Sequence, residues 1–530
     1  MTAAGALAKV TLTGSDLTIE AVEAVARGGA HVALDPAART RIQASRGVVE
    51  ALVAKGAVVY GVTTGVGALA DRTIQPEDAA RLQENLLLSH AAGVGEPLPR
   101  DVVRAMLVLR ANTLALGLSG VRPEVVERLL TFLELGIHPV VPSQGSVGAS
   151  GDLAPLAHLA LPVIGHGQVE LDGHVMPALM ALRETGLEPM TLGAKEGLAL
   201  LNGTQLMTAL GALLATDAER LLRTASVSAA MSVEALLATD VAFAAALQAA
   251  RPHPGQVQVA SELRWLLRDS GLQRVHHGSA HKVQDPYSLR CVPQVHGAVR
   301  DALDHLRRVL AIEMNAATDN PLVFADGGVA DASARATGGG RVISGGNFHG
   351  EPIALALDFA KLALAELGSI AERRVALLVD PRLNGGLPAF LAASSGLESG
   401  LMLLQYTAAA LVSEHKVLAH PASVDSIPTS ANQEDHVSMG PIAGRHARAV
   451  LDGVERIIAI ELLCAARALD LRLAEPGVSG ASPGAGVASA HELVRVASRP
   501  WDADREPGPD LEAVTRLVHD GALADLAVPR

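Results

Sequence analysis

The sequence is poor in aromatic residues, since phenylalanine, tryptophan and tyrosine together make up 2% of its 530 residues. Its three tyrosines are Tyr60, Tyr287 and Tyr406. In a chain with so few aromatic side chains, a tyrosine in a glycine-rich or polar segment is less readily explained as core packing. Tyr60 and Tyr287 both lie in segments of that kind, so they are candidates for a functional site.

Cysteine is almost absent as well, with only Cys291 and Cys464 in the chain. Two distant cysteines do not form a disulfide framework, and reduced thiols in a cytosolic enzyme fit better. The N-terminus lacks the basic segment and long apolar core of a secretory signal. No stretch of about 18 uncharged apolar residues stands out as a membrane span. These absences predict a soluble cytoplasmic protein.

Basic runs are also missing, and the net charge is −13. This balance argues against nucleic acid or an anionic membrane surface as a partner. Hydrophobic residues make up 49% of the chain and charged residues 19%, which is ample for buried helices and argues against disorder. A chain of 530 residues exceeds the size at which one core keeps growing, so two or three sub-domains are expected.

Helical patterning dominates the chain after a mixed beginning. Short β-type runs at Lys9–Thr13, His31–Leu34 and Ala57–Val62 flank a helical segment around Thr40–Ala54. Apolar residues then recur at three- and four-residue spacing near residues 100–136, 195–250, 295–315, 352–379, 399–420 and 443–471. Charges are sparse within Leu355–Leu378, which is typical of a mostly buried helix.

The pattern predicts a mainly α protein with a central bundle of long helices and a smaller mixed α/β N-terminal region. The expected division is an N-terminal region over 1–200, the bundle over 201–475 and a helical tail over 476–530. Buried helices rich in alanine, with little polar surface, also indicate a homo-oligomer held by helix–helix contacts.

The segment Gly145–His158, GSVGASGDLAPLAH, carries the first chemical signal. The small residues Gly148-Ala149-Ser150-Gly151 allow the backbone to fold sharply back on itself. The amide nitrogen of Gly151 can then attack the carbonyl carbon of Ala149. Loss of two waters, one of them from Ser150, leaves an exocyclic methylene conjugated to the new ring. Asp152 is placed to assist the proton transfers. The tripeptide alone is a weak signal, because a bare Ala-Ser-Gly is far more often an ordinary turn, here with Asp152 as a helix N-cap.

The whole segment closely resembles the signature of the histidine, phenylalanine and tyrosine ammonia-lyase family. Seven further blocks follow the family's order: VYGVTTGVG (59–67), NLLLSHAAGVGEPL (85–98), KEGLALLNGT (195–204), QDPYSLRC (284–291), NAATDNPL (315–322), SGGNFHGEP (344–352) and PTSANQEDHVSMG (428–440). The resemblance implies that Ala149-Ser150-Gly151 becomes the methylidene-imidazolone (MIO) group, with no metal or nucleotide. It also implies a fumarase/aspartase-like helix bundle and a homotetramer whose sites are each built from three subunits.

Eliminating ammonia from an α-amino acid requires an electrophile that bonds the amine and a base that removes a weakly acidic β-proton. By the resemblance, Tyr60 is that base, as a phenolate that the site must stabilise, because a free tyrosine ionises only near pH 10. Arg290 matches the ligand of the substrate carboxylate. Asn202 matches the residue that hydrogen-bonds the oxygen of the electrophile. The remaining matches, which line the electrophile or position the substrate, are Gln284, Tyr287 and Phe348.

Four residues bear on the choice of substrate. The pair Ser89-His90 matches the family position that faces the substrate side chain, and His90 can hydrogen-bond an imidazole. Gln433-Glu434 begins the run Gln-Glu-Asp-His found in histidine-specific relatives. A carboxylate opposite an imidazole N–H favours histidine and penalises a phenyl ring, which would leave the charge unpaired. The sequence therefore favours deamination of histidine to urocanate, although Thr63-Thr64 resembles the tyrosine branch.

Other interpretations remain open. A tyrosine or phenylalanine lyase would use the same electrophile, and so would an aminomutase, which returns the amine to the β-carbon. A non-catalytic helical protein is disfavoured by the intact Tyr60, tripeptide and Arg290. Gly65–Ala70 imitates a dinucleotide fingerprint, with Glu84 at a suitable distance, but no βαβ alternation follows. His276, His277 and His281 lack metal-site spacing and fit a polar loop better.

Overall fold

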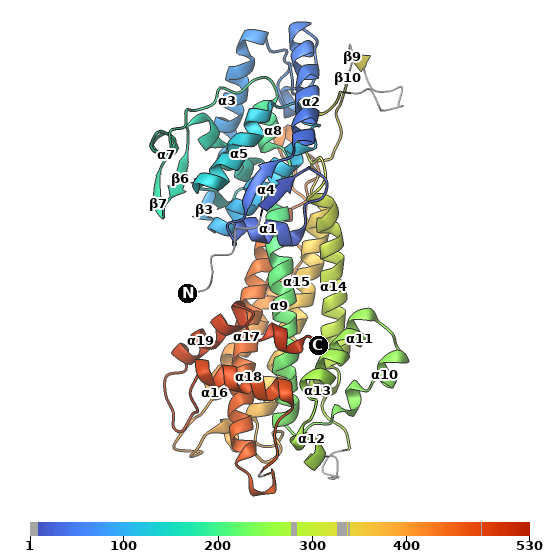
Figure 1. Ribbon diagram of the computed structural model, residues 1–530, viewed down its shortest axis with the longest axis vertical. Helices are drawn as coiled ribbons and strands as arrows, with labels where there is room; N and C mark the ends of the chain where they lie inside the picture. The colour runs from blue at the N-terminus through green and yellow to red at the C-terminus, as the bar shows by residue number, and fades with distance from the viewer. Residues whose placement is uncertain (1–8, 277–282, 326–335, 338–339, 479, 530) are drawn as a thin grey trace. The chain divides into compact units, whose positions relative to one another are not determined.

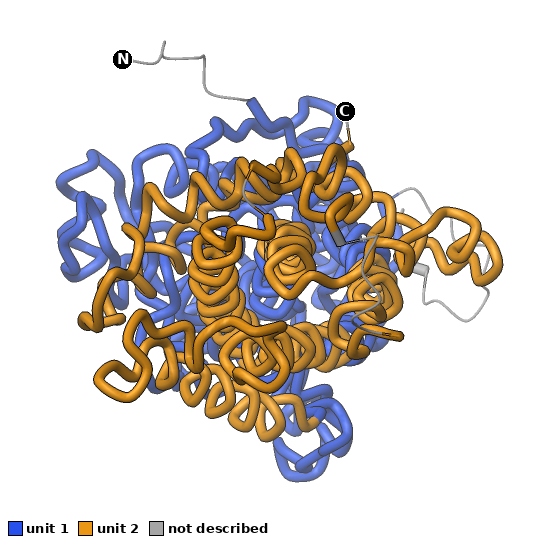
Figure 2. Tube along the Cα trace, turned by 90° about the horizontal axis from the view of Figure 1, so that it is seen from below, with its two compact units in different colours: residues 1–216, 306–357, 421–445 blue, residues 217–305, 358–420, 446–530 orange. Residues whose placement is uncertain are grey.

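The computed structural model describes residues 9–276, 283–325, 336–337, 340–478 and 480–529. Nineteen α-helices and ten short strands occur in these ranges, which confirms a mainly α protein (Figure 1). The chain forms two compact units, coloured separately in Figure 2: unit 1 contains Met1–Thr216, Leu306–Leu357 and Pro421–Arg445, and unit 2 contains Asp217–His305, Asp358–His420 and His446–Arg530. Each unit therefore combines three separate stretches. The consecutive division at residues 200 and 475 stays a prediction.

The helices differ greatly in length. Those within unit 1 are α1 (Ile19–Ala26), α2 (Pro36–Ala54), α3 (Ala79–His90), α4 (Arg100–Ala115), α5 (Pro123–Leu135), α6 (Leu153–Ala160), α7 (Ala178–Glu184) and α8 (Glu196–Leu201). Those within unit 2 are α10 (Ala245–Ala249), α11 (Pro254–Leu266), α12 (Gly271–His276), α13 (Tyr287–Arg290), α16 (Met402–Leu418), α18 (Ala485–Ala497) and α19 (Gly508–His519). The long helices α9 (Gln205–Ala235), α14 (Val292–Glu313), α15 (Glu351–Val379) and α17 (Gly440–Leu473) contribute residues to both units.

The described strands all belong to unit 1 and form four small sheets. They are β1 (Lys9–Leu12), β2 (His31–Leu34), β3 (Val94–Pro97), β4 (His138–Pro139), β5 (Pro142–Gln144), β6 (Gln168–Leu171), β7 (His174–Pro177), β8 (Leu322–Phe324), β9 (Ala336–Thr337) and β10 (Gly340–Ile343). β1 and β2 pair in parallel, β3 pairs antiparallel with β5, and the other sheets have the orders β4-β6-β7 and β8-β10-β9. The smaller mixed N-terminal region is thus confirmed.

The predicted strand over Ala57–Val62 is wrong, because this segment forms turns. Gly56 and Gly61 both adopt positive φ, 62° and 66°, which interrupts an extended strand. The Thr63 hydroxyl donates to the carbonyl of Ala57 and also accepts from the amide of Val59. These local bonds replace the ladder that a strand would need. The turns place Tyr60 at a cavity described below.

The predicted helices exist, but glycines divide two of them. The expected helix over 100–136 is interrupted between α4 and α5, where Gly117 and Gly120 have φ values of 77° and 68°. The expected helix over 195–250 is likewise broken around Gly203, which separates α8 from α9. This second break bears on function, since Asn202 and Gly203 contact the tripeptide segment.

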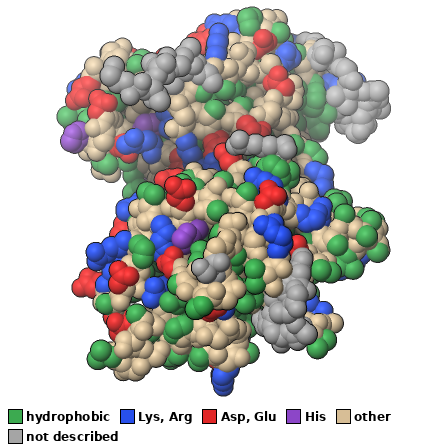
Figure 3. Space-filling view, turned by 60° about the horizontal axis from the view of Figure 1, so that its bottom comes forward, with side chains coloured by type: hydrophobic (Ala, Val, Ile, Leu, Met, Phe, Trp, Pro, Cys, Tyr) green, Lys and Arg blue, Asp and Glu red, His purple; other side chains and the backbone are tan. Residues whose placement is uncertain are grey.

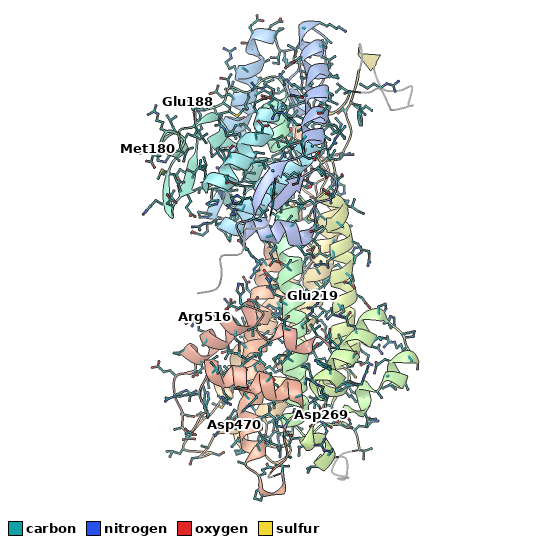
Figure 4. All side chains as sticks on the ribbon, in the orientation of Figure 1. Met180, Glu188, Glu219, Asp269, Asp470 and Arg516 are labelled. Carbon is teal, nitrogen blue, oxygen red and sulfur yellow. The ribbon has the colours of Figure 1, made fainter. Side chains whose placement is uncertain are left out.

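Unit 2 buries several charged groups, and they are paired. Arg374 and Glu461 are both fully buried and form two hydrogen bonds of 2.6 and 2.8 Å. Arg300 bonds Glu262 and also Glu219 of α9, which is labelled in Figure 4. Such pairing is required, because an isolated buried charge is very costly. These pairs fix the relative register of the helices in this unit.

The surface mixes apolar and charged side chains, as the face in Figure 3 shows. None of the helices in the described part of the chain combines the length and the apolar character needed to cross a bilayer. Cys291 and Cys464 both have free thiols.

Candidate functional site

A cavity of about 960 Å³ lies in unit 1, where α3, α6 and α8 pack against one another. Nine of the predicted site residues line it: Tyr60, Ser89, His90, Ala149, Ser150, Asn202, Phe348, Gln433 and Glu434. They come from blocks spread over almost 400 positions of sequence. Folding therefore brings together most of the residues that the motifs predict.

The backbone around the tripeptide lies in the left-handed region at three residues. Gly148, Ser150 and Gly151 all adopt positive φ, with values of 76°, 51° and 77°. A Cβ on Gly151 would come within 2.1 Å of the carbonyl oxygen of Gly203, and one on Gly148 would come within 2.2 Å of the Ser438 hydroxyl. Only glycine fits at either position. The chain therefore fits the MIO group at this segment.

Asn202 holds the carbonyl group of the central serine. Its side-chain Nδ2 donates to the Ser150 carbonyl oxygen at 2.9 Å, the oxygen that an MIO group would carry at this segment. Behind it, the fully buried Arg110 donates to the carbonyl of Asn202 at 2.9 Å and also to that of Ala199. The guanidinium thus anchors the backbone that carries the Asn202 amide. Sequence reasoning missed Arg110, whose only signal is a charge within an apolar helical run.

Asp152 is completely buried beside the tripeptide and at the start of α9. Its Oδ2 accepts hydrogen bonds from the amides of Leu206 and Met207 at 2.8 and 3.2 Å, whereas Oδ1 has no partner among the described residues. Burial raises the pKa of Asp152 to about 7, against the opposing effect of the two amide bonds. A carboxyl group with such a pKa exchanges protons readily at neutral pH, which suits the proton transfers of cyclisation.

The raised pKa of Asp152 predicts a specific dependence of stability on pH. The folded protein binds this proton more tightly than the unfolded chain, whose carboxyl has the ordinary value of 3.8. Raising the pH from about 4 to about 7 therefore removes stability, on the order of 4 kcal/mol. Asp152→Asn should abolish this component. In unfolding experiments from pH 4 to 8, the variant should gain stability relative to its parent as the pH rises.

Both proteins in that comparison should carry Ser150→Ala, so that neither cyclises and only the charge of Asp152 differs between them. A stability difference that does not change with pH would contradict a buried, protonated Asp152. The matched control is Asp435→Asn, because Asp435 is an exposed carboxylate lining the same cavity. Because its side chain is exposed, this substitution should change the free energy of unfolding little.

Glu434 lies directly against the tripeptide. Its Oε1 accepts a hydrogen bond of 3.5 Å from the Ser150 hydroxyl, and its Oε2 accepts one of 2.8 Å from the Thr429 hydroxyl. Backbone bonds between Thr429 and Glu434 in both directions close the loop that carries this carboxylate. The carboxylate is thus held in a fixed position at the cavity wall.

Tyr60 and His90 also line the cavity with defined partners. The Tyr60 hydroxyl accepts a hydrogen bond of 3.3 Å from the amide of Gly67. His90 closes α3, and its Nδ1 lies 2.8 Å from the carbonyl of Leu86. Nδ1 therefore carries a proton that it donates to this carbonyl, whereas Nε2 has no hydrogen-bond partner in the described part of the chain. Ser89 contacts the same histidine nitrogen at 3.1 Å.

The cavity includes polar residues that the sequence analysis did not single out. Asn320, His349 and His436 all line it. The Nε2 of His349 lies 3.3 Å from the carbonyl of His436, and their rings are 5.8 Å apart. Their signal was available, since all three lie within motif blocks quoted above. Phe348, half-buried, and Gln433, exposed, complete this side of the wall.

Three predicted site residues, Gln284, Tyr287 and Arg290, belong to unit 2 and are not among the lining residues of this cavity. Tyr287 is 72% exposed, and the Arg290 guanidinium lies 4.8 Å from the centre of its ring. The Nε of Arg290 is buried and has no partner among the described residues. Arg290 and Tyr287 thus form a cation–π pair in which the tyrosine is exposed and the arginine is half-buried, and Gln284 is exposed as well.

Several other features take clear positions. Gly67–Leu69 forms a short 3-10 turn, and Glu84 lies within α3, so Gly65–Ala70 does not open the helix of a dinucleotide-binding unit. His276 ends α12, whereas His277 and His281 lie outside the described residues, as does most of the glycine-rich segment 325–341.

Comparison with known proteins agrees with this geometry. The chain matches the aromatic amino acid lyase family over residues 17–496. It is 54% identical to a histidine ammonia-lyase of Symbiobacterium thermophilum over 96% of both chains. Among solved structures, it is similar to histidine ammonia-lyase from Trypanosoma cruzi, with a TM-score of 0.88 and 43% identity over 98% of this chain and 96% of that one. It is also similar to a tyrosine aminomutase from Streptomyces globisporus, with a TM-score of 0.89 and 38% identity over 98% of both chains. The chain therefore belongs to the aromatic amino acid lyase family.

Proposed function

We propose that the protein is a carbon–nitrogen lyase that converts L-histidine to trans-urocanate and ammonia. The family and the 54% identity to a histidine ammonia-lyase support this class of reaction. The observation that carries the proposal is the fixed carboxylate of Glu434, held in one cavity with Tyr60 and the folded-back Ala149-Ser150-Gly151 segment.

The MIO group formed from Ala149-Ser150-Gly151 supplies an electrophile for the amine of the substrate. Asn202 is placed to donate to the Ser150 oxygen, where negative charge develops, as donors of an oxyanion hole do. Tyr60 removes the β-proton, helped by the amide of Gly67, which donates to its oxygen. In this proposal the MIO group activates the amine as a leaving group, and Tyr60 is the base that removes the β-proton.

Arg290 is proposed to bind the substrate carboxylate through its planar guanidinium. Together with Tyr287 and Gln284 it would complete the site of another subunit in a homotetramer. The exposed Gln284 and Tyr287 are accessible to such a partner, and the half-buried Arg290 has no hydrogen-bond partner for its Nε among the described residues. Exposed apolar side chains on α15 and α16, namely Phe359, Leu362, Leu403 and Tyr406, would be covered in such an assembly. The free thiols agree with a cytoplasmic location.

Glu434 is proposed to set the preference for histidine. Its carboxylate would accept the imidazole N–H, while Nε2 of His90 offers a second acceptor on the α3 side of the cavity. A phenyl ring offers no donor, so it would leave the carboxylate desolvated and unpaired. Discrimination of this kind is strong, because binding of phenylalanine would leave a buried polar group without a hydrogen-bond partner.

Replacing Glu434 by alanine should therefore reduce the kcat/KM for histidine about 10- to 100-fold more than that for phenylalanine. Both values follow from the ultraviolet absorbance of the conjugated acid products. Glu434→Gln, which keeps the shape and removes the charge, should fall between wild type and Glu434→Ala. Equal losses on the two substrates would overturn the assignment of histidine.

The direct test of the whole function is incubation of the wild-type protein with histidine, tyrosine and phenylalanine in parallel. Release of ammonia should be fastest with histidine, and the acid product from histidine should be urocanate. The similarity to a tyrosine aminomutase makes one alternative specific, namely return of the amine to the β-carbon. Chromatography that finds a β-amino acid as the main product would favour that alternative.

A further inference from the structure

A second, smaller cavity of about 380 Å³ lies in unit 1 and shares no lining residue with the larger one. The loop between α1 and β2, helix α4, the end of α5 and strand β4 surround it. Three arginines line it, Arg27, Arg100 and Arg104, and Glu134 is its single lining carboxylate among the described residues. Nothing in the proposed reaction uses these groups.

Arg104 is the central cation of this cavity, and its hydrogen bonding is incomplete. Its Nε donates to the carbonyl of Val25 at 3.0 Å, and its Nη1 donates to the carbonyl of Leu133 at 3.2 Å and to Nε2 of His138 at 3.1 Å. These bonds fix the guanidinium plane. Its Nη2 has no partner among the described residues, and no described carboxylate pairs with this side chain.

His138 orients Arg104 and adds no charge of its own. Burial, followed by the charge of Arg104, lowers the pKa of His138 to about 4, so the ring is neutral at pH 7. Because Nε2 accepts from Arg104, the proton of the ring is on Nδ1. His138 is 8% exposed, which makes it a rigid support.

The other charged groups at the cavity have protein partners, which leaves Arg104 without a counter-charge. The pairs are Arg100 with Glu170, Arg27 with Asp101, and Glu134 with His31. Arg100 and Arg104 are four residues apart on α4, a spacing at which like charges destabilise a helix. Burial, and then the charge of Arg100, lowers the pKa of Arg104, so the surroundings penalise this cation.

We propose that this cavity is a binding site for a small oxyanion, a phosphate or a carboxylate, held by Nη2 of Arg104 and the charge of Arg100. An oxyanion would supply the missing acceptor and relieve the repulsion between the two arginines. A prepositioned guanidinium suits such ligands because its planar donors match their oxygens. The volume is within the range of small-ligand sites.

Calorimetric titration of the full-length protein with inorganic phosphate and, separately, with acetate tests this proposal. In a zwitterionic buffer at pH 7, wild type should bind at least one of the two saturably, and the comparison identifies the preferred class. Arg104→Gln should weaken binding at least about tenfold, since it removes a charged donor. Arg100→Gln should weaken it by a smaller factor, because its side chain is 55% exposed. The matched control, Arg516→Gln, changes an exposed arginine on α19 (Figure 4) and should bind as wild type does.

The variant Arg290→Gln distinguishes this site from the proposed substrate site. It should bind the anion as wild type does. Histidine turnover should be unchanged in Arg104→Gln, which lies outside the larger cavity. Absence of saturable binding in wild type would overturn the proposal, as would binding that survives in both Arg104→Gln and Arg100→Gln. Loss of anion binding in Arg290→Gln alone would place the anion in the substrate site and would also refute the proposal. If Arg104→Gln does not fold, Arg100→Gln decides.

Discussion

Ser150→Ala is expected to fold normally and to lose activity by roughly a thousandfold or more, as removal of a covalent catalytic group does. Alanine has no hydroxyl to lose, so the second dehydration cannot occur. The side chain of Ser150 makes a single long contact, 3.5 Å to Glu434, and its removal should cost little stability. Intact-mass measurement should find wild type two water molecules lighter than its sequence, and the variant should retain at least one of them.

The control for this variant is Ser143→Ala. Ser143 lies in β5, close in sequence to the tripeptide, but it does not line the larger cavity. It should keep both the mass deficit and the activity. A wild-type protein with the full mass of its sequence would refute the proposed electrophile, and turnover by Ser150→Ala near the wild-type rate would do so independently.

The motif blocks contain nine of the residues that line one cavity in the fold, and each block could be selected by its own local signal. Ser150 and Glu434 are 284 positions apart, yet their hydroxyl and carboxylate lie in contact. Each residue could be selected from its own motif, because the tripeptide and the Gln-Glu-Asp-His run each stand out in sequence. The same logic placed Tyr60 and Asn202 at one cavity.

Contacts and pKa shifts that arise only from tertiary structure were not predicted. Arg110 is a lone charge in an apolar run, and only the folded chain shows that it holds the carbonyl groups of Ala199 and Asn202. The raised pKa of Asp152 likewise depends on complete burial, which no local pattern reveals. The incorrect strand at Ala57–Val62 has the same origin, because the Thr63 hydroxyl competes for its backbone groups.

A substitution at Tyr60 can distinguish catalysis from formation of the MIO group. The tyrosine is half-buried, its hydroxyl has one hydrogen bond of 3.3 Å from Gly67, and it contacts no group of the tripeptide by hydrogen bonding. Removing the hydroxyl should therefore leave the fold and the cyclisation intact. A variant of Tyr60 thus isolates proton removal from formation of the electrophile, which a variant of Ser150 cannot do.

Tyr60→Phe is accordingly expected to lower kcat by roughly 10²–10⁴-fold, the usual contribution of a general base. Its intact mass should show the same deficit of two waters as wild type. Tyr406→Phe removes only the hydroxyl of a tyrosine on α16 and keeps the ring that the proposed tetramer would cover, so it should be neutral in both measurements. With histidine deuterated at the β-carbon, the kinetic isotope effect on turnover should be at least as large in Tyr60→Phe as in wild type, because proton removal becomes the limiting step in the variant. Full activity in Tyr60→Phe would assign the base to another cavity residue, and His90, which lines the same cavity, is then the next candidate.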